Sequence, residues 1–180
     1  EDMLKKLGIE SKYHNGLRVT DDETMDVVEM VLVGKVNSEL VNQINKWGGQ
    51  AVGLSGCDGS LIQARKLPLQ QHTDKKGVHH RVDLGSVGEV VKVNPDILSH
   101  LINKEMFIPI VSPLGISDDG ESLNINADTV ASEIAVALKA EKLFLMTDVL
   151  GVLDAEGHVL TDVRIKAVES LITAGTIQGG

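Results

Sequence analysis

Apolar residues recur at helical spacing in several segments of the chain, and most of these segments follow a capping signal. The longest runs from Met25 to Trp47 behind the capping sequence Thr20–Glu23, and we expect Gly34 to break or bend this helix. The remaining helices are expected at 3–7, 95–103, 127–138 and beyond Thr161 or Asp162.

Short apolar segments between these helices have the length of buried strands. They are expected at 50–54, 61–67, 107–113 and 142–146. The segment 82–93, rich in valine and glycine, has the pattern of a bent hairpin or β-ribbon, whereas 68–76 is polar and is expected to be a loop. Because strands and helices alternate and the strands are apolar throughout, the pattern predicts an α/β fold whose parallel sheet lies between helices.

The composition is that of a globular chain with an acidic surface. Among 180 residues, 17 Lys and Arg oppose 26 Asp and Glu, and the net charge of −9 argues against nucleic-acid binding and against a polybasic membrane contact. The length suffices for one sizeable core but not for two large domains. Cys57 is the single cysteine, which excludes an internal disulfide and fits a reducing compartment. No apolar run reaches the roughly 18 residues of a membrane span.

Several well-known catalytic motifs are absent from the sequence. It contains no GxxxxGK[ST] phosphate loop, no GxGxxG after a strand and no GxSxG nucleophile motif. The six histidines have no metal-ligand spacing. Any chemistry must therefore come from other polar residues.

The segment Leu123–Val130 has the strongest chemical implication. Asn124 and Asn126 alternate along an extended piece, so both amides are expected to face one side, and Asp128 follows in the first turn of a helix. Two amides and a carboxylate at such a point can hold a polar substrate and orient cationic groups. Asn126 and Asp128 would equally serve as helix caps, and the pattern leaves this alternative open.

Two further segments carry candidate residues. Arg18 lies between two apolar residues after a turn, where a guanidinium can pair with the carboxylate of a ligand or with that of a nearby Asp. Asp148 lies where a buried strand is expected to end, and ligands of open α/β sheets bind beyond the carboxyl ends of strands. A capped strand end is the alternative there.

Five segments together resemble the amino acid kinase family, in the family's order. They are NGLRVTD at 15–21, AVGLSGCDG at 51–59, VDLGSVGEV at 82–90, LNINAD at 123–128 and TDVLGVLD at 147–154. The first is the most discriminating, because it resembles the N-acetylglutamate kinases more than the other branches of the family, such as the aspartokinases or carbamate kinases. The resemblance covers essentially the whole chain.

The resemblance implies an open three-layer αβα sandwich with a mainly parallel sheet and a β-hairpin lid. It implies one domain over 1–180, with about 1–140 in the substrate-binding lobe and about 141–180 beginning the nucleotide-binding lobe. The implied enzyme transfers the γ-phosphoryl group of ATP to the side-chain carboxylate of N-acetyl-L-glutamate. The product would be N-acetylglutamyl 5-phosphate, an intermediate of arginine biosynthesis.

The resemblance also implies roles for individual residues. Arg18 would bind the α-carboxylate of the substrate, Asn124 and Asn126 its acetylamino part, and Asp128 would act in catalysis by organising the catalytic lysines. The nucleotide would be bound by Asp148, Val149, Leu150, Gly151, Val152, Leu153, Thr176, Ile177 and Gln178. Mg²⁺ would be bound through the phosphates of ATP, with no protein ligand.

The sequence departs from the family in its phosphate-clamping lysines. In the family one lysine precedes glycines on the first strand, and the other lies in a GGM-x-x-K-type segment; this chain starts after the first and ends at Gly180, before the second. We therefore expect the chain to be a central fragment with little or no turnover, although the whole enzyme would be active.

The resemblance implies a homodimer or higher homo-oligomer, formed through the long helix and a neighbouring strand. The cytoplasm is the expected compartment, or the plastid stroma for a plant protein. No nucleic-acid or membrane partner is expected, while binding of a PII-type signal protein and feedback by arginine stay undecided. The alternatives are a kinase for a related blocked acidic amino acid of the aminoadipate type and a non-catalytic ligand-binding module.

Overall fold

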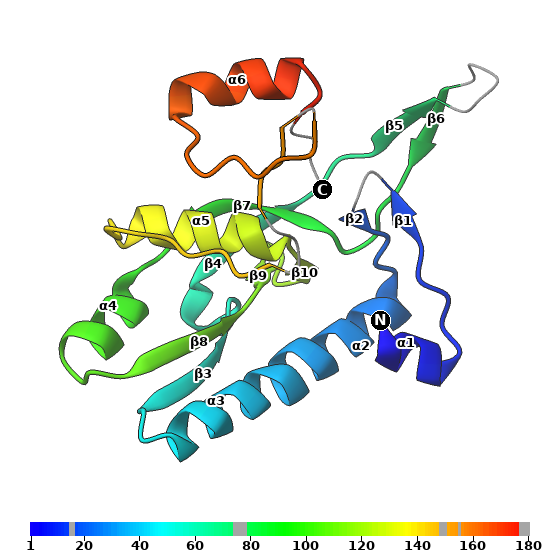
Figure 1. Cartoon of the computed structure of the whole chain (residues 1–180). Coiled ribbons are helices and arrows are strands. Elements are labelled where there is room, and N and C mark those ends of the chain that lie inside the picture. The colour runs from blue at the N-terminus through cyan, green and yellow to red at the C-terminus, as the bar shows by residue number, and fades with distance from the viewer. Residues whose placement is uncertain (15–16, 74–78, 148–150, 155, 177–180) are drawn as a thin grey trace. The chain divides into compact units, whose positions relative to one another are not determined.

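The computed structural model describes residues 1–14, 17–73, 79–147, 151–154 and 156–176 (Figure 1). The chain forms two compact units, Glu1–Leu143 and Phe144–Gly180. Among the described residues, no helix combines the length and the apolar character that crossing a membrane requires.

The longest helix of the first unit consists of three consecutive segments. They are α2 (Asp22–Glu29), the π-helical segment η1 (Met30–Val36) and α3 (Asn37–Lys46). Gly34 lies inside η1, so the helix continues through this glycine with a wider turn. The helix begins one residue later than the capping sequence predicted: Asp21 is the N-cap, and Thr20 is fully buried instead. A short helix, α1 (Asp2–Leu7), precedes it and ends at Gly8 with φ 76°.

The strands of the first unit form several small sheets. The strand β3 (Ala51–Ser55) pairs in parallel with β8 (Ile108–Ser112). A second sheet has the order β10 (Ser122–Asn124), β9 (Leu114–Ile116), β4 (Ile62–Lys66) and β7 (Gly88–Val93), in which only β4 and β9 are parallel. Two antiparallel pairs complete the set: β1 (Tyr13–His14) with β2 (Leu17–Arg18), and β5 (Gln70–Thr73) with β6 (His79–Val82).

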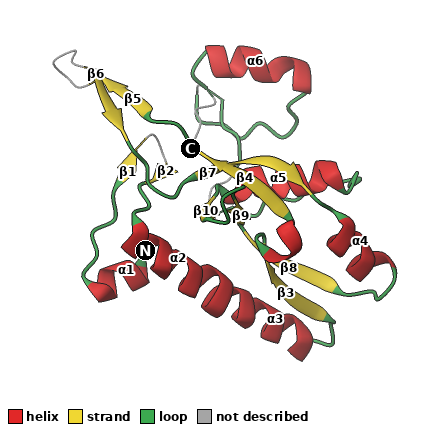
Figure 2. Ribbon diagram, turned by 180° about the vertical axis from the view of Figure 1, so that it is seen from behind, coloured by secondary structure: helices red, strands yellow, loops and turns green. Residues whose placement is uncertain are grey.

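Helices lie on both sides of the parallel pair. The helix α3 packs against β3 and β8, while α4 (Asp96–Asn103) packs against β8 and α5 (Ala127–Ala137) against β7. Figures 1 and 2 show α3 on one side of β3 and β8, with α4 and α5 on the other. The buried core between these elements consists of Leu61, Ile62, Ala64, Leu98, Leu123, Ile125 and Val130. This arrangement confirms the predicted α/β class with parallel strands and covering helices.

Three local predictions were wrong. The segment 142–146 forms no strand, because none of the described residues pairs with its backbone, and Phe144 is 82% exposed. Residues Gln70–Thr73, expected in a loop, form a strand because β6 supplies backbone partners. The segment 82–93 does not fold back on itself; its second half, β7, pairs with β4.

The described part of the second unit contains one helix, α6 (Ile165–Thr173), and one isolated bridge between Leu153 and Val159. Arg164, rather than Thr161 or Asp162, is the N-cap of α6 and makes no side-chain cap bond.

Candidate functional site

Arg18 and Asn124 line the same cavity of the first unit, although they lie far apart in the sequence. The cavity has a volume of about 190 Å³. Its apolar wall comes mainly from the long helix and includes Val27, Val28, Val31 and Leu32. Its polar part comes from Arg18, Asn124 and the N-terminal Glu1. A cavity with an apolar wall and a few polar groups suits a small ligand that has both charged and uncharged parts.

The guanidinium of Arg18, at the end of β2, is fixed by neutral neighbours. Its Nη1 donates to the Oγ of Ser11 at 2.8 Å, and its Cζ lies 4.7 Å from the centre of the Tyr13 ring. No carboxylate among the described residues forms an ion pair with Arg18, so the structural salt bridge considered as an alternative is not observed there. The charge of this guanidinium is therefore free to attract an anionic ligand.

Asn124 reaches the cavity from the last residue of β10. Its Nδ2 donates to the Oγ1 of Thr20 at 3.3 Å, and this hydroxyl donates to the carbonyl of Arg18 at 3.0 Å. A short chain of hydrogen bonds thus joins the two candidate residues. The sequence pattern had indicated Thr20 as part of a helix cap. Its position two residues after Arg18 on an extended segment was a signal that the two side chains share one face.

Asn126 and Asp128 lie outside the lining of this cavity. Asn126 is the N-cap of α5, and its Oδ1 accepts from the backbone N–H of Thr129 at 3.0 Å and from its hydroxyl at 3.3 Å. Asp128 is exposed in the first turn of α5. The capping alternative therefore describes the side-chain oxygen of Asn126, while the ligand and catalytic roles of both residues stay predictions.

The predicted nucleotide-binding residues belong to the second unit, and the structure describes only some of them. Asp148, Val149, Leu150, Ile177 and Gln178 lie outside the described residues. Gly151 has φ 136°, and the carbonyl of Val152 accepts from the N–H of Leu160 at 2.7 Å, next to the bridge at Leu153. The N–H of Thr176 donates to the carbonyl of Leu171 at 2.9 Å, after α6. Their nucleotide-binding role stays a prediction.

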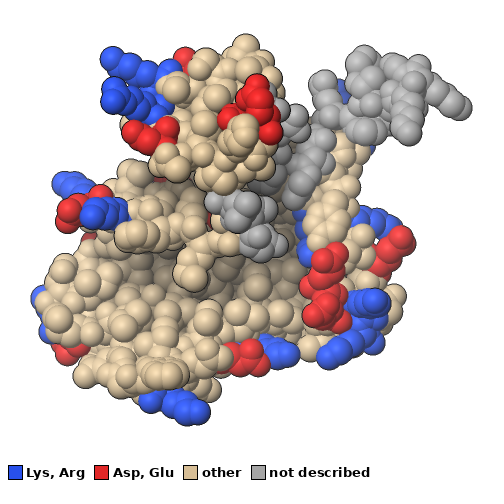
Figure 3. All heavy atoms as spheres, viewed as in Figure 1, with Lys and Arg blue, Asp and Glu red and all other residues tan. Residues whose placement is uncertain are grey.

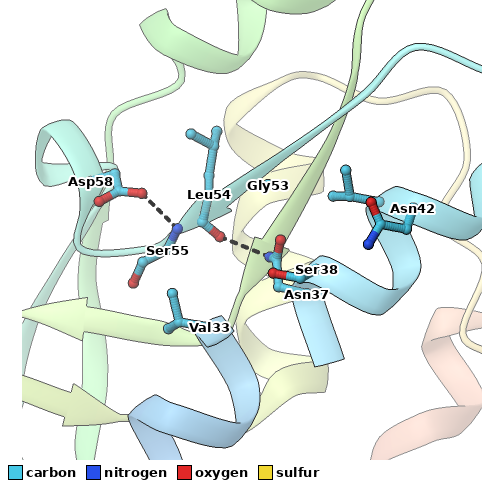
Figure 4. Close-up of a pocket in the computed structure, with 9 residues that line it drawn as sticks. Val33, Asn37, Ser38, Asn42, Gly53, Leu54, Ser55 and Asp58 are labelled. Carbon is cyan, nitrogen blue, oxygen red and sulfur yellow. Dashed lines mark hydrogen bonds between the residues drawn. The ribbon is translucent and has the colours of Figure 1, made fainter. Parts of the chain in front are cut away.

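A second cavity, of about 420 Å³, lies between the long helix and β3 (Figure 4). Asn37, Ser38 and Asn42 line it from the helix, and Ser55 and Asp58 line it from the end of β3 and the 3₁₀ turn η2 (Asp58–Ser60). Most of these polar groups bind the protein itself: Figure 4 shows Asn37 bonded to the carbonyl of Leu54 and Asp58 bonded to the N–H of Ser55. No local pattern of residues had indicated this contact between the helix and the sheet.

The charged side chains of the described residues were also considered as a possible site. Figure 3 shows Lys and Arg side chains close to Asp and Glu side chains at several places on the surface of the first unit. Within the part of the chain that the structure describes, no three His, Cys, Asp or Glu side chains are grouped so that they could hold a metal ion.

We compared the chain with known families and solved structures. Residues 1–178 match the model of the Amino acid kinase family. Among solved structures, smu.665 from Streptococcus mutans UA159 is 31% identical with a TM-score of 0.80, and the match covers 99% of this chain and 67% of that one.

Two further structures show the same fold. N-acetylglutamate synthase from Neisseria gonorrhoeae, complexed with coenzyme A and N-acetyl-glutamate, is 24% identical with a TM-score of 0.72, over 96% of this chain and 37% of that one. The same enzyme complexed with coenzyme A and L-arginine is 20% identical with a TM-score of 0.68, and the match covers 96% of this chain and 39% of that one. The chain thus spans about two thirds of the streptococcal protein and less than half of the synthase. It belongs to the amino acid kinase family, which indicates a kinase-type enzyme with an amino-acid-related substrate.

Proposed function

We propose that the chain is part of an N-acetyl-L-glutamate kinase and that the cavity lined by Arg18 and Asn124 binds the amino acid substrate. The observation that carries the proposal is that Arg18 and Asn124, to which the resemblance assigns substrate binding, line one cavity, and that Arg18 forms no ion pair with a described carboxylate. The N-acetylglutamate bound to the synthase of the same fold supports the choice of ligand class.

In this proposal each residue binds one part of the substrate. The guanidinium of Arg18 pairs with the α-carboxylate, and Asn124 binds the acetylamino group. The apolar wall of the cavity, including Val31 and Leu32, contacts the methylene and methyl groups of the ligand. We propose that Asn126 and Asp128, at the start of α5, lie at the edge of the site where the side-chain carboxylate of the substrate meets the phosphoryl group.

The chemistry requires positioning more than proton transfer. The side-chain carboxylate of the substrate is ionised near pH 7 and can attack the γ-phosphorus of ATP directly. The bond to the β,γ-bridging oxygen breaks as the new P–O bond forms, and ADP leaves. In the proposal ATP is bound by the segment that contains Gly151 to Leu153 and by Thr176 and its neighbours, and Mg²⁺ is bound through the phosphates.

The proposal includes a homodimer formed through the long helix and β3. Within the described residues β3 pairs only with β8, which leaves its other edge without a strand, and Trp47 at the end of α3 is 88% exposed. Binding of a PII-type signal protein is a further hypothesis. We place the enzyme in the cytoplasm, or in the plastid stroma if the source is a plant.

Calorimetric titration of the chain with small ligands tests the substrate. We expect N-acetyl-L-glutamate to bind. L-Glutamate should bind at least about tenfold more weakly, because it carries an ammonium where the acetylamino group is expected. N-acetyl-aminoadipate should also bind more weakly than N-acetyl-L-glutamate. Preference for the aminoadipate compound would favour the alternative kinase. No binding of any of the three at millimolar concentration would refute the proposed site.

Turnover separates the enzyme from a non-catalytic module. We expect ADP formation from the full-length protein with N-acetyl-L-glutamate and ATP, and little from the 180-residue chain alone. Binding without turnover in the full-length protein would favour the non-catalytic alternative.

A further inference from the structure

Thr20 is a fully buried polar residue between the two candidate ligand-binding residues. Its exposed fraction is 0%. Its Oγ1 donates to the carbonyl of Arg18 at 3.0 Å and accepts from the Nδ2 of Asn124 at 3.3 Å. A buried hydroxyl requires partners of this kind, because an unsatisfied polar group in the interior costs free energy.

The hydroxyl also determines which way the amide of Asn124 points. A threonine hydroxyl has one proton, and in Thr20 that proton is donated to the carbonyl of Arg18. Towards Asn124 the Oγ1 can therefore only accept, so the amide must turn its NH₂ group to Thr20. The Oδ1 of Asn124 then faces away from Thr20, and no described residue donates to it.

The backbones around these side chains are held in place independently of the hydroxyl. The N–H of Thr20 donates to the carbonyl of Leu84 at 2.8 Å, and the carbonyl of Thr20 accepts from the N–H of Ser86 at 2.6 Å. The carbonyl of Ser86 in turn accepts from the N–H of Asn124 at 2.8 Å. Thr20 and Asn124 therefore keep their spacing through residues 84–86, and the hydroxyl contributes mainly the orientation of the amide.

We propose that Thr20 is a positioning residue that orients the amide of Asn124 so that its Oδ1 accepts the N–H of an N-acylated amino acid. This inference rests on the proposed function. An acceptor at this point favours a ligand with an amide N–H and disfavours one with an ester oxygen, whose lone pairs would face Oδ1. It also disfavours any ligand that presents a bare carboxylate to the same atom.

The test compares two ligands and three forms of the protein by calorimetry. The ligands are N-acetyl-L-glutamate and O-acetyl-2-hydroxyglutarate, which differ only in an N–H replaced by an oxygen. We expect the unmodified protein to prefer the N–H ligand about tenfold, the scale of one hydrogen bond to a buried group. Thr20→Val removes the hydroxyl at nearly constant shape, so the preference should fall to about twofold. Thr20→Ser keeps the hydroxyl and should keep the preference.

The controls separate orientation from general loss of structure. Thr24→Val is the matched variant, because Thr24 is also buried, at 3%, and lies outside the cavity lining. It should keep the ligand preference even if it lowers the melting temperature as much as Thr20→Val. Equal weakening of both ligands by Thr20→Val would overturn the inference, and so would a preference below about twofold in the unmodified protein, whether or not the variants fold. Failure of the unmodified protein to bind either ligand would instead refute the proposed function.

Discussion

The side-chain Nδ2 of Asn37 donates to the backbone carbonyl of Ile110 at 2.8 Å and thereby ties the start of α3 to β8. The same amide contacts the carbonyl of Leu54 at 3.2 Å and the Oγ of Ser112 at 3.1 Å. Ser112 donates onward to the carbonyl of Leu32 at 2.9 Å, in the π-helical segment. Since Leu32 also lines the cavity of Arg18, this contact fixes one wall of the candidate site to the parallel strands.

Replacing Asn37 by leucine should destabilise the protein by about 1–3 kcal/mol, because it leaves two partly buried carbonyls and the buried hydroxyl of Ser112 without this donor. The residue is 5% exposed, so the substitution removes a donor from a largely buried position. Urea denaturation measures the change as a lower midpoint at constant slope. An unchanged midpoint would show that the contact contributes nothing to stability.

Gly53 is expected to be essential beside this amide. A Cβ at this position would collide with the Oδ1 of Asn37. We expect Gly53→Ala to destabilise by about 1–3 kcal/mol, the scale of overpacking. Gly34→Ala is the matched control: this helical glycine has nothing within 4 Å of an added Cβ, so its substitution should be neutral or stabilising by up to about 1 kcal/mol. Equal effects of the two substitutions would contradict the packing argument.

Arg18→Ala should weaken binding of N-acetyl-L-glutamate by about 2–5 kcal/mol, the scale for removing one half of a buried charge pair. Binding of ATP should be nearly unchanged, because the nucleotide residues belong to the other unit. Arg65→Ala is the control, since Arg65 forms an exposed surface pair with Glu89 at 2.7 Å. Calorimetry with each ligand measures both effects. An equal loss of affinity for substrate and nucleotide would refute the role given to Arg18.

Two substitutions of Asn126 separate its capping role from a role in binding. Asn126→Asp keeps an oxygen that can accept from the N–H of Thr129, so the melting temperature should hold. Asn126→Ala removes the cap and should cost about 1 kcal/mol. If the amide NH₂ also binds the substrate, both variants should weaken binding in calorimetry. A folded Asn126→Asp variant with unchanged affinity would leave capping as the whole function of this side chain.

The sequence was most informative where a local pattern determines a local structure. The apolar run at 108–111 predicted a strand of a parallel sheet, and β8 pairs in parallel with β3. The left-handed end of α1 at Gly8 reflects the freedom of glycine at positive φ. Pairing between distant segments is decided by partners that the local sequence does not contain. For that reason residues Gln70–Thr73 looked like a loop, and Lys142–Met146 looked like a strand.

The same limit applies to the candidate site. Arg18 and Asn124 were identified from their residue types and their resemblance to the family, and the structure brings both to one cavity. The hydroxyl of Thr20 escaped notice because its two side-chain bonds join positions 18 and 124, a connection that no periodic pattern encodes. Thr20 also precedes an acidic residue before a helix, which made a cap the simpler interpretation.

Asp21, the N-cap of the long helix, makes the stability of the protein depend on pH. Its pKa is lowered from the usual value, first because the side chain of Thr24 donates to the carboxylate, then because the backbone N–H of Thr24 does so at 2.9 Å, with a smaller contribution from the charge of Lys12. A lowered pKa in the folded state means that the carboxylate stabilises the fold above about pH 4 and loses this effect as the pH falls through the lower folded value.

Asp21→Asn keeps a good cap without a titrating group, so its stability relative to the unmodified protein should rise as the pH is lowered from 6 to 3. Asp21→Ala should instead be about 1 kcal/mol less stable at pH 6 and approach the unmodified protein in acid. Urea midpoints of the three proteins at both pH values measure this, and a difference between Asp21→Asn and the unmodified protein that does not change with pH would show that the carboxylate charge contributes nothing to the cap.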